Sequence, residues 1–128
     1  DLTRAKQSPE GIAQAEQWHQ KALGLCEQNY QAHPSYESRR DLSIAYIRLG
    51  DLARAKQTAE GTTRAEQWYL KMLDMHEQNY RAFPCAQSKN DLSISYNRLA
   101  GIAQRKNTPE GQAEADQWAK KQQALLSE

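Results

Sequence analysis

The sequence predicts an all-α fold built from tandem helix pairs, and three observations support this. Residues 1–50 and 51–100 align without a gap and share 28 identical positions, and residues 101–128 begin a third copy. Apolar residues recur at spacings of three and four, as on amphipathic helices. No segment alternates with a period of two for long enough to form a strand. A fixed period of this size is typical of stacked units that complete one another's cores.

We expect one repeat array over residues 1–128: an α-solenoid of antiparallel helix pairs with about five helices. Each unit contributes a first helix, called helix A, and a second helix, called helix B. The expected order is B, A, B, A, B, and only the last turn of the first helix A remains, in residues 1–6. The units are expected to be a partial repeat over 1–37, a full repeat over 38–87 and a partial or capping repeat over 88–128.

Helix A is expected at about residues 39–56 and 89–106. Ser38 precedes Asp41 by three residues, and the same pair recurs one unit later. This spacing predicts a serine N-cap that resembles a capping box. The residues of helix A at spacings of three and four in the full unit are Leu42, Ala45, Tyr46, Leu49, Ala53 and Lys56.

Helix B is expected to begin between residues 59 and 62 and to end near residue 82. The segments before it, such as Thr58-Ala59-Glu60-Gly61, fit either a type I turn or an N-cap followed by the first helical turn. Pro34 and Pro84 are expected to end helix B, because the residue before a proline is pushed out of helical geometry. Its stripe in the full unit consists of Ala65, Trp68, Tyr69, Met72, Met75, His76, Asn79, Tyr80 and Phe83.

The anchors of each unit resemble the tetratricopeptide repeat family, and in the full unit they are Tyr46, Leu49, Gly50, Ala53, Ala65, Tyr69 and Met72. The family's usual unit has about 34 residues, so this longer unit is similar to long-unit bacterial members. The resemblance implies a right-handed superhelix whose concave groove, lined by A helices, binds a partner peptide or helix. The groove residues implied by alignment are Arg4, Ile47, Asp51, Arg54, Asn97, Gln104 and Arg105.

Arg4 and Arg54 occupy the same repeat position, beside Asn97. Such a row could hold a carboxylate through charge-assisted hydrogen bonds, although a solvated helix face fits the pattern equally. The tryptophan stripe is predicted to pack between B helices and neighbouring A helices and not to form a binding ladder; it comprises Trp18, Trp68 and Trp118.

Catalytic and metal-binding motifs are absent from the sequence. No phosphate-binding glycine loop, nucleophile elbow, His-Glu-x-x-His or Cys-x-x-Cys segment is present. His76 aligns with Cys26, but two candidate ligands are too few for a metal site, so the histidines are expected to be half-buried structural residues. We therefore expect no enzyme activity, no metal and no other cofactor.

Composition narrows the possible partners. Seventeen basic and sixteen acidic residues give a net charge of +1, without the basic excess that phosphate binding needs, so nucleic acid is not expected. No apolar run approaches the roughly 20 residues that span a bilayer, so no membrane is expected. Cys26 and Cys85 do not align, which predicts two free thiols. Free thiols are compatible with a reducing compartment, and a cytoplasmic location is expected. Asp1 aligns with the mid-repeat Asp51, so we expect an excised fragment.

Two functions fit these features. The first is a non-catalytic protein–protein interaction scaffold that binds a protein or peptide partner in the concave groove. The alternative is a structural spacer or a self-associating array, with a homodimer formed through an uncapped N-terminal end. The Gln- and Lys-rich last helix, with Lys120, Lys121, Gln122 and Gln123, is expected to cap the other end.

Overall fold

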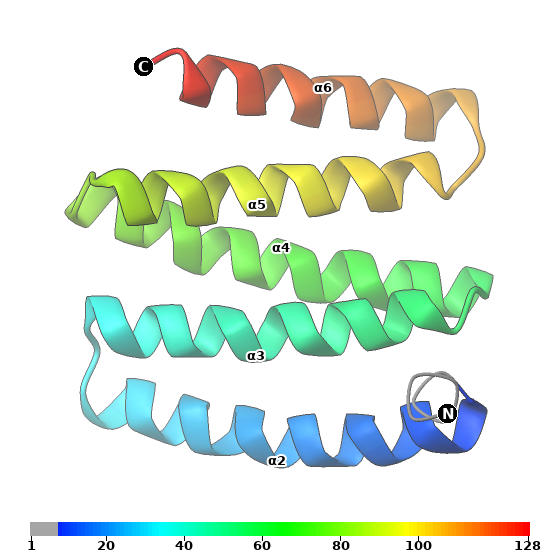
Figure 1. Cartoon of the computed structure of the whole chain (residues 1–128), viewed down its shortest axis with the longest axis horizontal. Helices are drawn as coiled ribbons and strands as arrows, with labels where there is room; N and C mark the ends of the chain where they lie inside the picture. Colours follow the sequence, from blue (N-terminus) through cyan, green and yellow to red (C-terminus); the bar gives the residue numbers. More distant parts are fainter. Residues whose placement is uncertain (1–7) are drawn as a thin grey trace.

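A computed structural model describes residues 8–128, which form five α-helices and no strand (Figure 1). Each helix packs on the next one along the chain and runs antiparallel to it, and α4 lies behind α3 and α5 in this view. The all-α prediction is confirmed, and α2, α4 and α6 are B helices whereas α3 and α5 are A helices. The helices are α2 (Pro9–Ala32), α3 (Tyr36–Ala55), α4 (Ala59–Ala82), α5 (Ala86–Gln104) and α6 (Pro109–Leu126).

The B helices begin and end where the sequence predicts. The Thr58 hydroxyl accepts a hydrogen bond of 2.9 Å from the Gly61 N–H, and the same cap opens α2 and α6. The N-cap interpretation of these segments is therefore confirmed over the type I turn. Gln57 and Asn107, each with a φ of 57°, turn the chain just before the caps of α4 and α6. At the other end, α4 stops at Ala82, two residues before Pro84.

The A helices begin about three residues earlier than predicted, and the expected serine cap is wrong. Ser35 is the N-cap of α3, and its hydroxyl accepts from the Ser38 N–H at 3.0 Å. In return the Ser38 hydroxyl accepts from the Ser35 N–H at 2.8 Å. Ser38 is therefore the third helical residue of a capping box, a place that glutamate or glutamine usually takes. Cys85 and Ser88 repeat this arrangement at α5.

The core is continuous from α2 to α6 and is densest between α3 and α4. Tyr69 and Met72 of α4 and Leu49 of α3 are almost completely buried. Gly50 allows this close approach, because a Cβ there would lie 2.5 Å from a ring carbon of Tyr69. One unit later the glycine is replaced by Ala100 and the tyrosine by the exposed Ala119, so this close approach is not repeated.

The tryptophan stripe divides into two packed rings and one exposed ring. Trp68 stacks on Tyr46 with ring centroids 5.9 Å apart, and Trp118 stacks on Tyr96 at 6.0 Å. The core prediction is confirmed for these two, both of which pack against the buried cluster. For Trp18 it is wrong, because this indole is 72% exposed.

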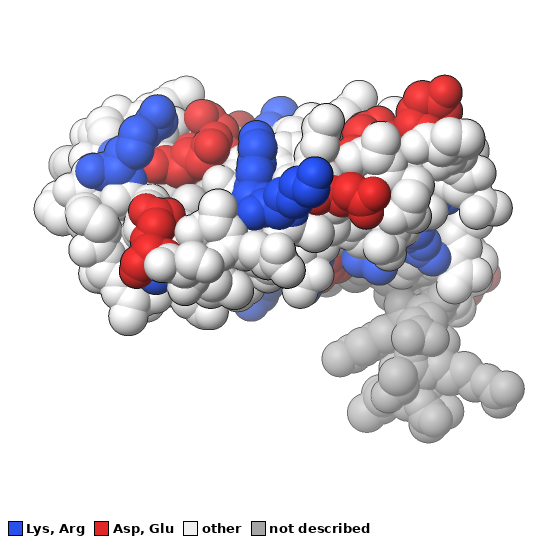
Figure 2. Space-filling model, turned by 90° about the horizontal axis from the view of Figure 1, so that it is seen from above, with Lys and Arg blue, Asp and Glu red and all other residues white. Residues whose placement is uncertain are grey.

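The α6 end of the molecule is polar. Figure 2 shows this face, on which lysines and arginines are interspersed with aspartates and glutamates. Both cysteines are free, as predicted. Among the described residues, no helix combines the length and apolar character needed to cross a membrane.

Candidate functional site

Two inter-helix ion pairs join α3 to α5, although their residues are about fifty positions apart in the sequence. Near one end the Arg40 Nε atom lies 2.9 Å from Asp91 Oδ2. Further along, the Arg98 Nε atom lies 3.2 Å from Asp51 Oδ1. The Asp91 carboxylate is nearly buried, whereas the other three side chains are about one-third to one-half exposed. The two A helices therefore present one shared surface with an ion pair at each end.

A small pocket opens between these ion pairs, and its volume is about 130 Å³. Its walls are half-buried isoleucines from both helices, and its floor is reached by a side chain of α4. We call it the α3–α5 pocket. It is lined by Arg40, Ser43, Ile44, Ile47, His76, Asp91 and Ile94.

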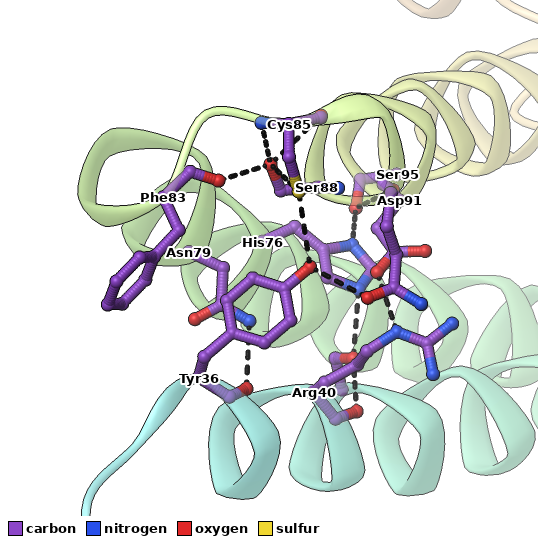
Figure 3. Close-up of polar contacts among 11 residues, drawn as sticks. Tyr36, Arg40, His76, Asn79, Phe83, Cys85, Ser88, Asp91 and Ser95 are labelled. Atoms are coloured by element: carbon purple, nitrogen blue, oxygen red, sulfur yellow. Dashed lines mark hydrogen bonds and ion pairs between the residues drawn. The ribbon is translucent and has the colours of Figure 1, made fainter.

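A buried histidine network supports the floor of this pocket (Figure 3). The Ser43 hydroxyl donates to the Arg40 carbonyl oxygen at 2.6 Å. It therefore accepts from His76 Nε2–H at 2.8 Å, and His76 Nδ1 accepts from the Ser95 hydroxyl at 2.6 Å. Both ring nitrogens are thus used in holding α3, α4 and α5 together, and neither is free to bind a metal or take a substrate proton.

His76 is held in its neutral form. Burial lowers the pKa of the ring from its usual 6.5 to about 4, because desolvation penalises the imidazolium. The Asp91 carboxylate opposes this shift, and the Arg40 guanidinium adds to it. A neutral ring at physiological pH fits the network, since an imidazolium could not accept from Ser95.

Further polar contacts fix the helix ends beside the pocket (Figure 3). The Asn79 amide donates to the Tyr36 carbonyl oxygen at 3.1 Å, and the Tyr36 hydroxyl donates to Gln87 at 3.1 Å. The edge of one ring meets the face of the other between Tyr36 and Phe83, with centroids 5.8 Å apart. Cys85, the exposed N-cap of α5, has its pKa lowered mainly by the hydroxyl of Ser88 and then by that residue's N–H.

Most of the residues predicted for the groove lie along α3 and α5. Ile47 lines the pocket, and the carboxylate of Asp51 accepts from both Arg98 and the hydroxyl of Tyr69. The Asp51 contact adds to burial in raising the pKa of Tyr69. Asn97 is exposed on the surface of α5.

The remaining predicted groove residues lie at the far end of the two helices. The Arg54 guanidinium lies against Gly101, and the Arg54 carbonyl oxygen accepts from Arg105 Nη1 at 2.9 Å. Gln104 is exposed. Arg4 lies outside the described residues, so the arginine row predicted from the repeat is represented only by Arg54.

Apart from Ile47, sequence reasoning missed the residues that build the pocket. His76 was predicted to be a half-buried structural residue, but it is nearly fully buried and forms hydrogen bonds with Ser43 and Ser95. A signal was present in the sequence: a serine recurs at the same position inside the apolar stripe of each A helix. A polar residue kept on a buried face needs a hydrogen-bonding partner, and in the last unit Gln122 supplies it to Ser93 at 3.0 Å.

Within residues 8–128 no cluster of three or more His, Cys, Asp or Glu side chains is placed to hold a metal ion. Comparisons with protein-family models, curated proteins and solved structures found no match. Function is therefore inferred from the arrangement of the side chains.

Proposed function

We propose that this protein is a non-catalytic interaction module that binds a peptide or helix of a partner protein along α3 and α5. The observation that carries the proposal is the α3–α5 pocket, which places half-buried isoleucines between two ion pairs. An apolar recess with charged side chains on both sides suits a partner segment that has one apolar side chain flanked by polar ones.

The size of the pocket fits one apolar side chain. Its volume of about 130 Å³ is close to that of cavities of about 150 Å³ that hold a benzene ring. Ile44, Ile47 and Ile94 form its walls, and the ring of His76 is fixed in the floor. A rigid recess favours binding because little side-chain freedom is lost when the partner enters.

The far end of the same surface supplies charge. Arg54 is half-buried and Arg105 is exposed, and both lie beyond the Asp51–Arg98 ion pair. A partner with one apolar anchor and an acidic group further along its length would match both parts of the surface. The packing of each helix on the next also supports a tetratricopeptide-type solenoid, which forms part of this proposal.

A peptide-array screen with the full chain tests the proposal. Peptides that bind are then titrated against Ile94→Glu, which places a charge in the pocket wall, and against Arg54→Glu, which reverses the charge at the far end. Leu126→Glu is the matched control, because Leu126 is an exposed apolar residue of α6 outside the pocket.

Binding through the pocket predicts at least a tenfold loss of affinity for Ile94→Glu, since burying a carboxylate costs more than about 1.4 kcal/mol. Arg54→Glu should weaken the binding of acidic peptides, and Leu126→Glu should change nothing. Peptides that bind equally well to all three variants would remove this surface from consideration. Circular dichroism of each variant establishes that it is folded.

A further inference from the structure

The α3 helix carries a row of side chains with a seven-residue period. Arg40, Ile47 and Arg54 follow one another at this interval. Seven residues are nearly two helical turns, so successive members of the row point within about 20° of each other and lie about 10.5 Å apart along the helix axis. The row is basic, apolar and basic, and it has this order in both directions.

Contacts with α5 show that the row faces the groove between the two A helices, here called the α3–α5 groove. The Arg40 Nε atom is paired with Asp91, and Ile47 lines the α3–α5 pocket. The Arg54 guanidinium lies against Gly101 of α5. Because α4 lies behind α3 and α5 in Figure 1 and reaches the floor of the pocket, the groove opens on the opposite side of these two helices.

The α3–α5 groove carries more positive than negative charge. Both of its aspartates are already held in ion pairs with arginines, whereas Arg54 and Arg105 have no ion-pair partner among residues 8–128. Arg40 is also accessible, because its side chain is 36% exposed and neither of its Nη atoms is hydrogen-bonded within the described residues. The charged side chains of the groove are Arg40, Arg54, Arg98, Arg105, Asp51 and Asp91. This excess of guanidinium groups favours an acidic partner.

The α5 side of the groove adds no charge at the matching positions. The residues at the same three repeat positions of α5 are all exposed amides: Asn90, Asn97 and Gln104. Side-chain amides both donate and accept hydrogen bonds, so they tolerate many polar groups of a partner. The order of charge along the groove is therefore set by the row on α3.

The spacing of the row matches a helix and not an extended chain. A helix lying along the groove presents residues i−7, i and i+7 on one face, at the same intervals of about 10.5 Å. An extended chain covers that distance in about three residues, and residues three apart point to opposite faces of a strand. A polyproline helix keeps every third residue on one face, but each turn advances only about 9.3 Å, so it loses register by about 2 Å over the row.

We propose that the partner segment bound in the α3–α5 groove is one acidic amphipathic helix, with an apolar residue at position i and acidic residues at i−7 and i+7. The apolar side chain enters the α3–α5 pocket beside Ile47, and the two carboxylates accept hydrogen bonds from Arg40 and Arg54. This identity of the partner rests on the proposed function, since the pocket is the same one.

Labelled synthetic peptides titrated into the full chain by fluorescence anisotropy test the spacing. The probe is a helix-forming peptide of about 22 residues, rich in alanine and glutamine, with glutamate at i−7 and i+7 and leucine at i−3, i and i+4. The control has the same composition with its glutamates at i−5 and i+5, which point about 140° away from the central leucine. We expect saturable one-to-one binding of the probe and at least fivefold weaker binding of the control.

A third peptide tests whether the bound partner is a helix. It is the probe with proline at i−1 and i+1, which prevents a continuous helix and leaves the leucines and glutamates in place. We expect it to bind at least about tenfold more weakly than the probe. Because these comparisons use only the unchanged chain, they do not depend on the folding of any variant.

Variants of the chain locate the acidic positions. Arg54→Glu should weaken binding of the probe about fivefold, because a pair of opposite charges becomes a pair of like charges. Arginine in place of one glutamate of the probe, at either i−7 or i+7, should restore binding to this variant, and the position that does so gives the direction of the bound helix. Arg81→Glu is the matched control: Arg81 is exposed on α4 outside the groove, so the same change of net charge there should have no effect. Circular dichroism establishes that each variant is folded.

Four results would overturn the proposal: no binding of the probe, a control peptide bound as tightly as the probe, a proline peptide bound as tightly as the probe, or no recovery in the charge swap. In each case, peptides from the array screen that lose affinity on Ile94→Glu would still support the proposed function. Binding of the probe that Ile94→Glu leaves unchanged would instead remove the pocket, and with it both the proposed function and this partner.

Discussion

Protonation of His76 should make the fold measurably weaker in mild acid. The ring is buried and neutral, with Ser43 and Ser95 on its two nitrogens and Asp91 and Arg40 nearby. Its pKa is about 4 in the folded state against an ordinary value of 6.5. Between these values the unfolded chain binds more protons than the folded chain, so the free energy of unfolding falls as the pH falls.

The size of the effect follows from the two pKa values. Each pH unit between 6.5 and 4 removes about 1.4 kcal/mol, so His76 accounts for about 3 kcal/mol of stability that is present at pH 7.5 and lost at pH 4. This is a large share of the roughly 5–15 kcal/mol that typical domains have. Carboxylates also titrate near pH 4, so the contribution of His76 must be isolated by comparison with a variant.

The assay is urea unfolding followed by circular dichroism at several pH values from 4 to 7.5, for the unchanged chain and for His76→Gln. Glutamine cannot be protonated, so the gap in stability between the two proteins should shrink by about 3 kcal/mol on going from pH 7.5 to pH 4. His33→Gln is the control for replacing a histidine by glutamine, because His33 is exposed and lies outside the network of Ser43 and Ser95. An equal pH dependence for His76→Gln and the unchanged chain would refute the reasoning.

Three further comparisons test the packing and the thiols. Gly50→Ala should lower the free energy of unfolding in urea by about 1–3 kcal/mol, because a Cβ there would lie 2.5 Å from the ring of Tyr69. Gly24→Ala is the matched comparison; it has open space around it and should raise the free energy of unfolding by about 0.5–1 kcal/mol. Trp68→Ala should lower the free energy of unfolding by about 3 kcal/mol, and Trp18→Ala by less than about 0.5 kcal/mol, because of these two only Trp68 is packed against the core. Equal losses of stability would contradict this. With a thiol-specific disulfide reagent at pH 7.5, Cys85 should react faster than Cys26. Hydrogen bonds from Ser88 lower the pKa of Cys85, whereas burial raises the pKa of Cys26. Cys85→Ser should remove the fast phase of the reaction.

The helices could be predicted from the sequence because the repeat displays each local signal more than once. The stripe of helix B and its Thr58 cap located α4 correctly, since the threonine, the glycine three residues later and Pro84 all agree. The start of helix A was misplaced because Ser35 and Ser38 are both good N-cap residues. The choice between them depends on which hydroxyl reaches which backbone N–H, and sequence spacing does not distinguish the two arrangements.

The pocket was harder to predict because it is assembled from three helices. Ile47 and Asp51 could be placed on the A-helix surface by alignment. The hydrogen bonds from Arg40 to Asp91 and from His76 to Ser43 and Ser95, however, join residues that lie 19 to 51 positions apart in the sequence. The tryptophan stripe predicted a packed Trp18, whereas the uncapped N-terminal end predicted a partly uncovered one, and Trp18 is 72% exposed. The identity of a residue within a repeat gives the kind of surface it belongs to, whereas its burial depends on whether the neighbouring helix is present.

Native-state hydrogen exchange tests most directly whether neighbouring helices complete one another's buried faces. Among residues 8–128, α4 packs against both α3 and α5, whereas α2 packs mainly against α3. Amides in the middle of α4 should therefore exchange most slowly, and those of α2 should exchange at least tenfold faster, because local opening of α2 breaks only one interface. Exchange in α2 as slow as in α4 would contradict the claim that neighbouring helices complete one another's buried faces.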